Sequence, residues 1–283
     1  MALRTLAALF IAGGLAGPAL AQSPQLRPAQ DDKWCSEESD WGRSRTCAVF
    51  EASWAAGGPM SVDASPNGGI SVTGWDRNEV RLLAKVTTQA DDEAAAREVA
   101  SAVQIHAGAK VYAEGPDSGR NRSWSVSYRL QVPTGAALSL HSLNGGIHLQ
   151  NVNGDLNFTT TNGGLHLKNV GGKVVGRTTN GGLHVELVGS EWQGEGLDLE
   201  TTNGGIHVQV PRRYNAHLDM ATTNGSVHAP GLVVRPDDGD EDDDEDGSSY
   251  KRHRRQRTVN MDLGSGGRVL RLRTTNGGVH VGD

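Results

Sequence analysis

The chain has 283 residues, of which 38 are glycine, whereas aromatic residues make up only 5% and the hydrophobic set 36%. The glycines follow no three-residue period and only 10 prolines are present, which excludes collagen, and the many Gly, Thr and Asn residues exclude a coiled coil. The formal net charge of −6 lacks the basic footprint that general nucleic-acid binding needs, so we expect no nucleic-acid partner.

Residues 1–21 have the organisation of a secretory signal peptide. Arg4 supplies the positive start, Leu6 to Leu15 form the apolar stretch, and Ala19-Leu20-Ala21 form the small-residue cleavage site. The apolar stretch is shorter than the ~20 residues that span a bilayer, and no later segment is apolar enough to do so. We therefore expect an exported protein in the periplasm, the cell envelope or the extracellular space, with no transmembrane segment.

The next segment, residues 22–48, begins with a Pro-, Gln- and Asp-rich stretch that is predicted to be disordered. It contains the two cysteines of the chain, Cys35 and Cys47. In an oxidising compartment these are predicted to form one disulfide that closes a short loop, and two separate surface thiols are the alternative.

Residues 49–133 are predicted to form a small α+β cap for a repeat that follows. Val80 to Val86 alternate as a strand, residues 90–103 read as a helix with acids in its first turn, and Trp124 to Val132 alternate again. Asn67-Gly68-Gly69-Ile70 resembles a degenerate first repeat, although its preceding alternation is out of step by one residue. A cap is expected because the ends of stacked repeats need to be covered.

One phrase, Asn-Gly-Gly/Ser-apolar-His, recurs through residues 134–283. Its first four steps are 18, 18, 23 and 21 residues, and the last step of 52 contains an insertion. Apolar residues at every second position on both sides of each turn predict two short strands with one buried face. The turn asparagines are Asn144, Asn162, Asn180, Asn203, Asn224 and Asn276.

Each unit is thus predicted to be a strand, a tight turn, a second strand and another turn. Asn-Gly is a favoured turn pair because both residues tolerate a positive φ. One unit cannot bury its apolar face, whereas stacked units can, which predicts a mainly β fold: a β-solenoid with coils of about 18–23 residues. An antiparallel meander of hairpins is the alternative, and the identical register of every unit favours the solenoid.

The sequence from about Trp54 onward resembles the bacterial putative-adhesin family of β-strand-repeat envelope proteins, a domain of unknown function. The residues that carry the resemblance are Ile70 to Asp76, Tyr128 to Pro133, and the Asn-Gly-Gly-apolar repeats. The resemblance implies adhesion to a surface, glycan or partner protein, and it supplies no catalytic residues.

A charged insertion at about residues 235–257 interrupts the last step of the repeat. Residues 237–246 contain nine acids, and a basic run follows, so a disordered, solvated loop is expected. Asp242, Asp244 and Asp246 match the beginning of a calcium-binding loop, but His253 stands where a bidentate Glu is required. Diffuse association with cations is the alternative.

The sharpest chemical feature is a histidine that follows each turn. In a solenoid these side chains would form a column on one outer face, where neighbours could share Zn²⁺ or Cu²⁺, although no carboxylate or thiolate completes a tetrahedral set. The alternative to metal binding is that histidine is simply one acceptable polar residue at an exposed strand position, copied by repeat duplication. Protonation near the ordinary pKa of ~6.5 would accumulate like charges, so acid is expected to destabilise the stack. The residues are His148, His166, His184, His207, His228 and His280.

The sequence contains no catalytic or cofactor-binding motif, and the predicted outward acids do not repeat in register. It therefore predicts an exported non-catalytic scaffold, adhesin-like in binding an envelope protein, a glycan or a surface. The alternative is a cation-binding or pH-responsive envelope module that uses the histidines and the acidic loop. Self-association is a further expectation, because the C-terminal coil would leave an unpaired strand edge.

Overall fold

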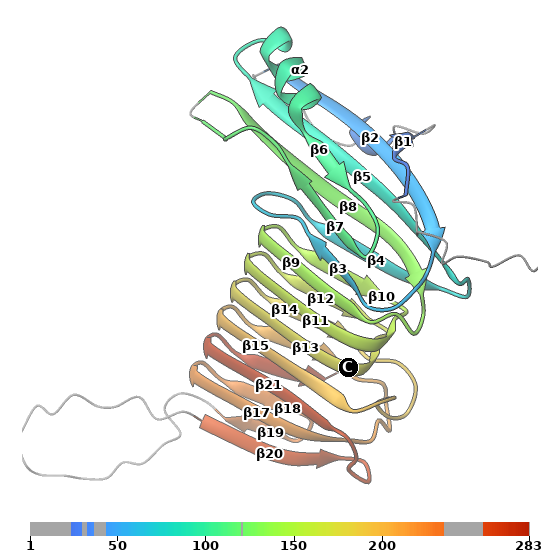
Figure 1. The fold of residues 1–283 in the computed structure, drawn as a ribbon. Helices are drawn as coiled ribbons and strands as arrows, with labels where there is room; N and C mark the ends of the chain where they lie inside the picture. Colours follow the sequence, from blue (N-terminus) through green and yellow to red (C-terminus); the bar gives the residue numbers. More distant parts are fainter. Residues whose placement is uncertain (1–23, 30–32, 37–43, 120, 235–256, 283) are drawn as a thin grey trace, which may run out of the picture.

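The residues described by a computed structural model form two β-sheets, one of 12 strands (sheet A) and one of 10 strands (sheet B) (Figure 1). The structure describes residues 24–29, 33–36, 44–119, 121–234 and 257–282. The predicted signal peptide and nearly all of the charged insertion, including Asp242, Asp244 and Asp246, lie outside these residues. The predicted mainly β, solenoid-like repeat fold is confirmed.

The solenoid consists of coils that each place one strand in sheet B and the next strand in sheet A. Strands of adjacent coils pair in parallel with like residues opposite each other, for example Leu156 with Leu138 and His148 with His166. The Asn-Gly turn therefore joins two sheets and does not close a hairpin within one sheet. The coils are β3 (Met60–Asp63) with β4 (Ile70–Trp75), β9 (Leu138–Asn144) with β10 (Ile147–Gln150), β11 (Asn153–Asn162) with β12 (Leu165–Lys168), β13 (Gly171–Asn180) with β14 (Leu183–Glu186), β15 (Gly196–Asn203) with β16 (Ile206–Gln209), β17 (Ala216–Asn224) with β18 (Val227–Ala229), and β21 (Val269–Asn276) with β22 (Val279–Gly282).

The coil β3–β4 is the degenerate first repeat. Asn67 bridges to Asn144, and Val62 lies opposite Leu140. Val62 precedes its turn asparagine by one residue more than Leu140 does, and the extra residue lies between β3 and Asn67. The segment expected to be a cap thus contributes one full coil to the stack.

The remainder of the N-terminal part extends the two sheets beyond this coil and carries the helices. Asp92 caps α2 by accepting a hydrogen bond from the Ala95 N–H at 2.8 Å, and α2 buries Ala96 and Val99. β2 begins at Ser44, ahead of the boundary at residue 48 that the sequence predicts. These elements are β1 (Arg27–Pro28), α1 (Lys33–Ser36), β2 (Ser44–Ala55), β5 (Glu79–Ala90), α2 (Glu93–Ala102), β6 (Gln104–His106), β7 (Lys110–Glu114) and β8 (Ser123–Pro133).

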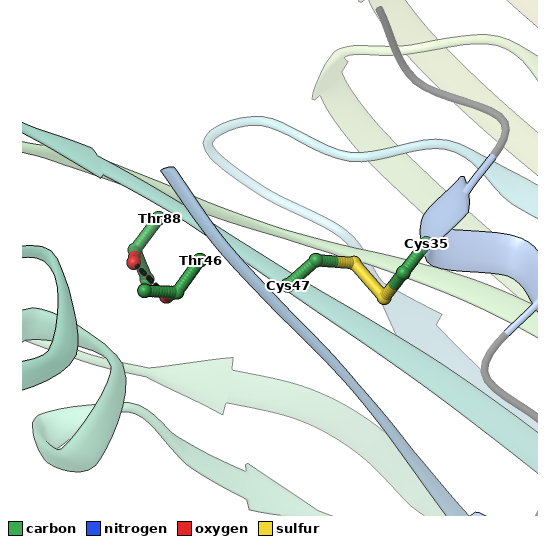
Figure 2. Close-up of a disulfide and its surroundings, with 4 residues drawn as sticks. All are labelled: Cys35, Thr46, Cys47 and Thr88. Carbon is green, nitrogen blue, oxygen red and sulfur yellow. Dashed lines mark hydrogen bonds between the residues drawn. A yellow bond between two sulfur atoms is a disulfide. The ribbon is translucent and has the colours of Figure 1, made fainter. Parts of the chain in front are cut away.

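The predicted disulfide between Cys35 and Cys47 is confirmed and attaches α1 to β2 (Figure 2). The neighbouring Thr46 lies on the other side of β2, with its hydroxyl 2.6 Å from the Thr88 hydroxyl. Thr88 donates to the Ala96 carbonyl of α2 at 2.8 Å, so Thr46 is the donor to Thr88. These contacts hold α1, β2, β5 and α2 together.

Each coil after the first buries its threonine or serine two residues before the turn asparagine. Thr201, 1% exposed, donates to the Gly181 carbonyl of the adjacent coil at 2.9 Å. A buried hydroxyl is costly unless it is hydrogen-bonded, and each of these six coils makes the same bond. The equivalent donors are Ser142, Thr160, Thr178, Thr222 and Thr274, which donate to Gly68, Gly145, Gly163, Gly277 and Gly204.

The first glycine of each turn is required by close contact between coils. A Cβ on Gly181 would lie 2.0 Å from the Gly163 carbonyl oxygen, whereas a Cβ on Gly182 has its nearest contact at 3.6 Å. Of the glycines in these repeated turns, only Gly277 has a positive φ, 156°. The sequence-based explanation by positive φ was therefore wrong, and the steric contact explains why Ser226 can occupy the second position.

The last coil in sequence lies inside the stack. β21 pairs with β15 on one side and β17 on the other (Figure 1). In the other sheet, β22 lies between β16 and β18. The end of the stack is formed instead by β19 (Leu232–Val234), antiparallel to β18, and β20 (Arg257–Leu263), antiparallel to β17. The expectation that the C-terminal coil offers a free edge for self-association was wrong, because both of its strands are paired on both sides.

Charge explains this order of coils. Arg271 of β21 lies opposite Asp198 of β15 and Asp219 of β17, with Nε 3.0 Å from Asp219. Arg273 also donates to Asp219, at 2.9 Å. Stacking in sequence order would place Asp198 directly opposite Asp219, and like charges opposite each other destabilise a sheet. The inserted coil separates the two acids with an arginine.

We predict that the two adjacent turn glycines differ sharply in their tolerance of a side chain. Gly181→Ala forces a Cβ against a backbone carbonyl and is expected to lower the free energy of unfolding by about 3 kcal/mol or more. Gly182→Ser, the matched control, introduces the residue found at Ser226 and is expected to cost less than about 1 kcal/mol. Urea denaturation measures both, and equal losses would contradict the steric explanation.

Candidate functional site

The candidate site is the histidine column, which consists of the six histidines that follow the turns and lies on the outer face of sheet A. The structure brings all of them together, in the spatial order His148, His166, His184, His207, His280 and His228. Successive ring centroids are 4.7, 5.9, 5.2, 4.8 and 5.8 Å apart. The column follows the stacking of the coils, so His280 precedes His228.

The rings present their faces to one another. Three neighbouring pairs have interplanar angles of 0–11°, and the other two are tilted by 39° and 41°. In a stacked pair the nitrogen lone pairs lie in the ring planes and do not converge on a shared ion. Among the residues that the structure describes, no group of three or more His, Cys, Asp or Glu side chains is placed to hold a metal ion.

A groove of about 530 Å³ runs along the column. Its lining consists of histidines from His166 to His280, the second residue of each turn, such as Gly182 and Ser226, and the apolar residue that follows it, such as Leu183. The His166 ring lies close to the turn of its own coil, since its Nε2 is 3.5 Å from the position that a Cβ on Gly164 would occupy. We call this feature the histidine groove.

An asparagine ladder runs parallel to the histidine column at the turns. In each coil after the first, the side-chain Nδ2 donates to the Oδ1 of the equivalent asparagine in the preceding coil of the stack, at 2.6–3.0 Å. From the sequence these residues were predicted only as turn formers, and the ladder was not predicted. Its signal in the sequence is an asparagine at the same position of every coil. The ladder consists of Asn67, Asn144, Asn162, Asn180, Asn203, Asn276 and Asn224.

Two histidines of the column have lowered pKa values. Burial lowers the pKa of His148 first, and the neighbouring His166 lowers it further. Burial also lowers the pKa of His280, followed by repulsion from His207 and His228 on its two sides. The sequence predicted repulsion alone, and the structure gives loss of hydration as the larger cause.

Comparisons with known proteins give two structural similarities. No family model and no curated protein matches the chain. A crystal structure of a putative cell adhesion protein from Clostridium sporogenes has 11% identity and a TM-score of 0.35, and the match covers 82% of this chain and 98% of that one. A putative adhesin from Bacteroides fragilis has the same identity and TM-score, with 83% and 97% covered. Such values are too low to assign a family or a function.

The described residues include no helix that is long and apolar enough to cross a membrane.

We predict that acid destabilises the stack through His148 and His280. A histidine whose pKa is lowered by folding binds protons more readily when unfolded, so stability is present above the unfolded pKa of ~6.5 and is lost as the pH falls below it. The melting temperature is expected to be a few degrees lower at pH 5 than at pH 7.5.

The double variant His148→Gln/His280→Gln is expected to lose part of this acid sensitivity, as measured by differential scanning calorimetry. His141→Gln, which changes an exposed histidine outside the column, is the matched control. An unchanged pH dependence in the double variant would contradict the assignment.

Proposed function

We propose that the protein is an exported, non-catalytic β-repeat scaffold that binds a surface or a partner molecule in the manner of an adhesin. The observation that supports this is the regular outer face of sheet A, where the histidine column and the histidine groove repeat the same chemistry coil after coil. The proposed export rests on the signal-peptide pattern of residues 1–21, and the disulfide agrees with an oxidising compartment.

The scaffold suits this role because its repeating contacts hold each coil in a fixed register. Buried threonines, the asparagine ladder and in-register strands connect every coil to the next. A ligand with its own repeat can therefore contact several coils at once, and linked weak contacts give a much higher overall affinity than one contact alone. We accordingly assign the repeats of residues 134–283 to binding and the preceding α+β elements to closing one end.

A second candidate function is a pH-responsive module, favoured by the close packing of six imidazoles at 4.7–5.9 Å. Neutral rings stack without charge repulsion, whereas imidazolium ions at this separation repel one another. Acid would thereby change the charge of the outer face of sheet A within the range in which histidine titrates.

We predict that binding to the native envelope depends on the outer face of sheet A. The variant His166→Ala/His184→Ala/His207→Ala is expected to reduce retention of purified protein on an envelope fraction about ten-fold, because it removes the centre of the column. The matched control, Thr161→Ala/Thr179→Ala/Thr202→Ala, changes the equivalent coils on the outer face of sheet B. Retention is measured by co-sedimentation.

Equal retention of the two variants would contradict the assignment of this face, and no retention of the unaltered protein would contradict the proposed function itself.

A further inference from the structure

Among the residues that the structure describes, the histidine groove contains no fixed negative charge. None of the described residues that line it is an acid, whereas five histidines contribute to it. A smaller groove of about 250 Å³ continues along His148, and its lining includes Lys168 and Glu186. Those two side chains form an ion pair at 2.9 Å, so their charges offset each other. The charge of the whole strip is therefore set by the histidines.

The described groups that face the column from neighbouring strands add no unpaired negative charge. On β4, Ser71 lies opposite His148, and on β8, Arg129 lies opposite Ser71. The Arg129 guanidinium lies 4.0 Å from the centre of the Trp34 ring, so an aromatic cation cluster adjoins this end of the column. Two positions further along each strand, on the same face of sheet A, lies a second row of side chains. It consists of Thr73, Gln150, Lys168, Glu186 and Gln209.

A ligand that carries repeated anionic groups would complement the charge of this row of histidines when they are protonated. Imidazolium ions at these separations repel one another, because the rings are less than 6 Å apart. An anion placed beside two such ions offsets this repulsion, so binding and proton uptake are linked. Charges along the ligand that recur near the coil spacing of ~4.8 Å would satisfy several coils at once.

The shape of the groove favours a sugar polymer over a nucleic acid. At the turns its lining is glycine and serine, without side chains large enough to block a ring, and its wall is a row of imidazole edges that offer N–H donors. A uronic acid polymer carries one carboxylate on each sugar, so its negative charges repeat along the chain as the histidines repeat along the groove.

We propose that the histidine groove binds an extended anionic polysaccharide of the uronic acid type, lying along the stack axis and held more tightly as the pH falls through the histidine range. This inference deepens the proposed function and rests on it. The carboxylates pair with protonated histidines, and the sugar rings lie over the turn residues Gly182, Gly205 and Gly278.

Isothermal titration calorimetry with oligogalacturonate tests the proposal. Affinity is expected to be at least about ten-fold higher at pH 5.5 than at pH 7.5, with circular dichroism verifying that the protein is folded at both. Titrations in two buffers of different ionisation enthalpy are expected to show the uptake of more than one proton for each chain bound.

Two variants locate the site and one controls for histidine content. His184→Gln/His207→Gln/His280→Gln is expected to lower the affinity about ten-fold and to reduce the proton uptake by more than half. Gly182→Val/Gly205→Val fills the floor of the groove and is expected to weaken binding at both pH values, since a Cβ fits at each position without contact below 3.4 Å. His141→Gln is expected to bind as the unaltered protein does.

An affinity that does not change with pH, or that survives the triple histidine variant, would overturn the proposal. Equal binding of neutral dextran, or tighter binding of single-stranded DNA, would overturn the assigned ligand class. If oligogalacturonate fails to bind while envelope retention persists and still depends on sheet A, only this inference fails. If envelope retention is absent as well, the proposed function fails with it.

Discussion

The structure depends on the close approach of identical backbone turns in adjacent coils. The carbonyl of each first turn glycine points at the Cα of the next coil's first glycine, where no side chain fits, and it also accepts the hydroxyl of a buried threonine or serine. This contact fixes the register of the coils. A one-residue slip would place asparagine or the second turn residue against the carbonyl and would turn the apolar face outward. The alignment of the histidines on the outer face follows directly, because they are four residues beyond the same asparagine in every coil.

Register alone does not determine the order of the coils in the stack, since every coil has the same turn. The order is determined by charge pairing between the outward side chains of sheet B. Glu200 of β15 lies between Arg177 of β13 and Arg273 of β21, and Asp219 of β17 accepts from both arginines of β21. Opposite charges thus alternate across neighbouring strands where the last coil enters the stack. Adjacent coils also complement each other inside the core. The large side chain of Phe158 fills the space that the opposite residue, Gly176, leaves empty.

Much of this architecture could be predicted from the repeat, because period-two alternation around a fixed turn defines both the buried face and the column. Even the offset of Val62 before Asn67 was visible in the sequence. The order of the coils was not predicted, because periodicity is identical in all of them and the order is distinguished by the pairing of outward charges such as Asp198, Arg271 and Asp219. The role of the first turn glycine was also misjudged, since a steric contact between coils leaves no trace in the local turn pattern. For the histidines, the sequence indicated their alignment but could not give the ring stacking or the burial that lowers the pKa of His148 and His280.

Disulfide trapping of neighbouring coils tests the account most directly. Parallel strands place opposite Cα atoms about 5 Å apart, which is within the range that a disulfide spans, whereas positions two coils apart are too distant. The pair His207→Cys/His280→Cys is therefore expected to cross-link under mild oxidation, as measured by mass spectrometry of the linked peptides. The pair His207→Cys/His228→Cys is expected to remain reduced, because β22 lies between those strands. Efficient cross-linking of the second pair and not the first would show that the coils stack in sequence order and would contradict the structure described above.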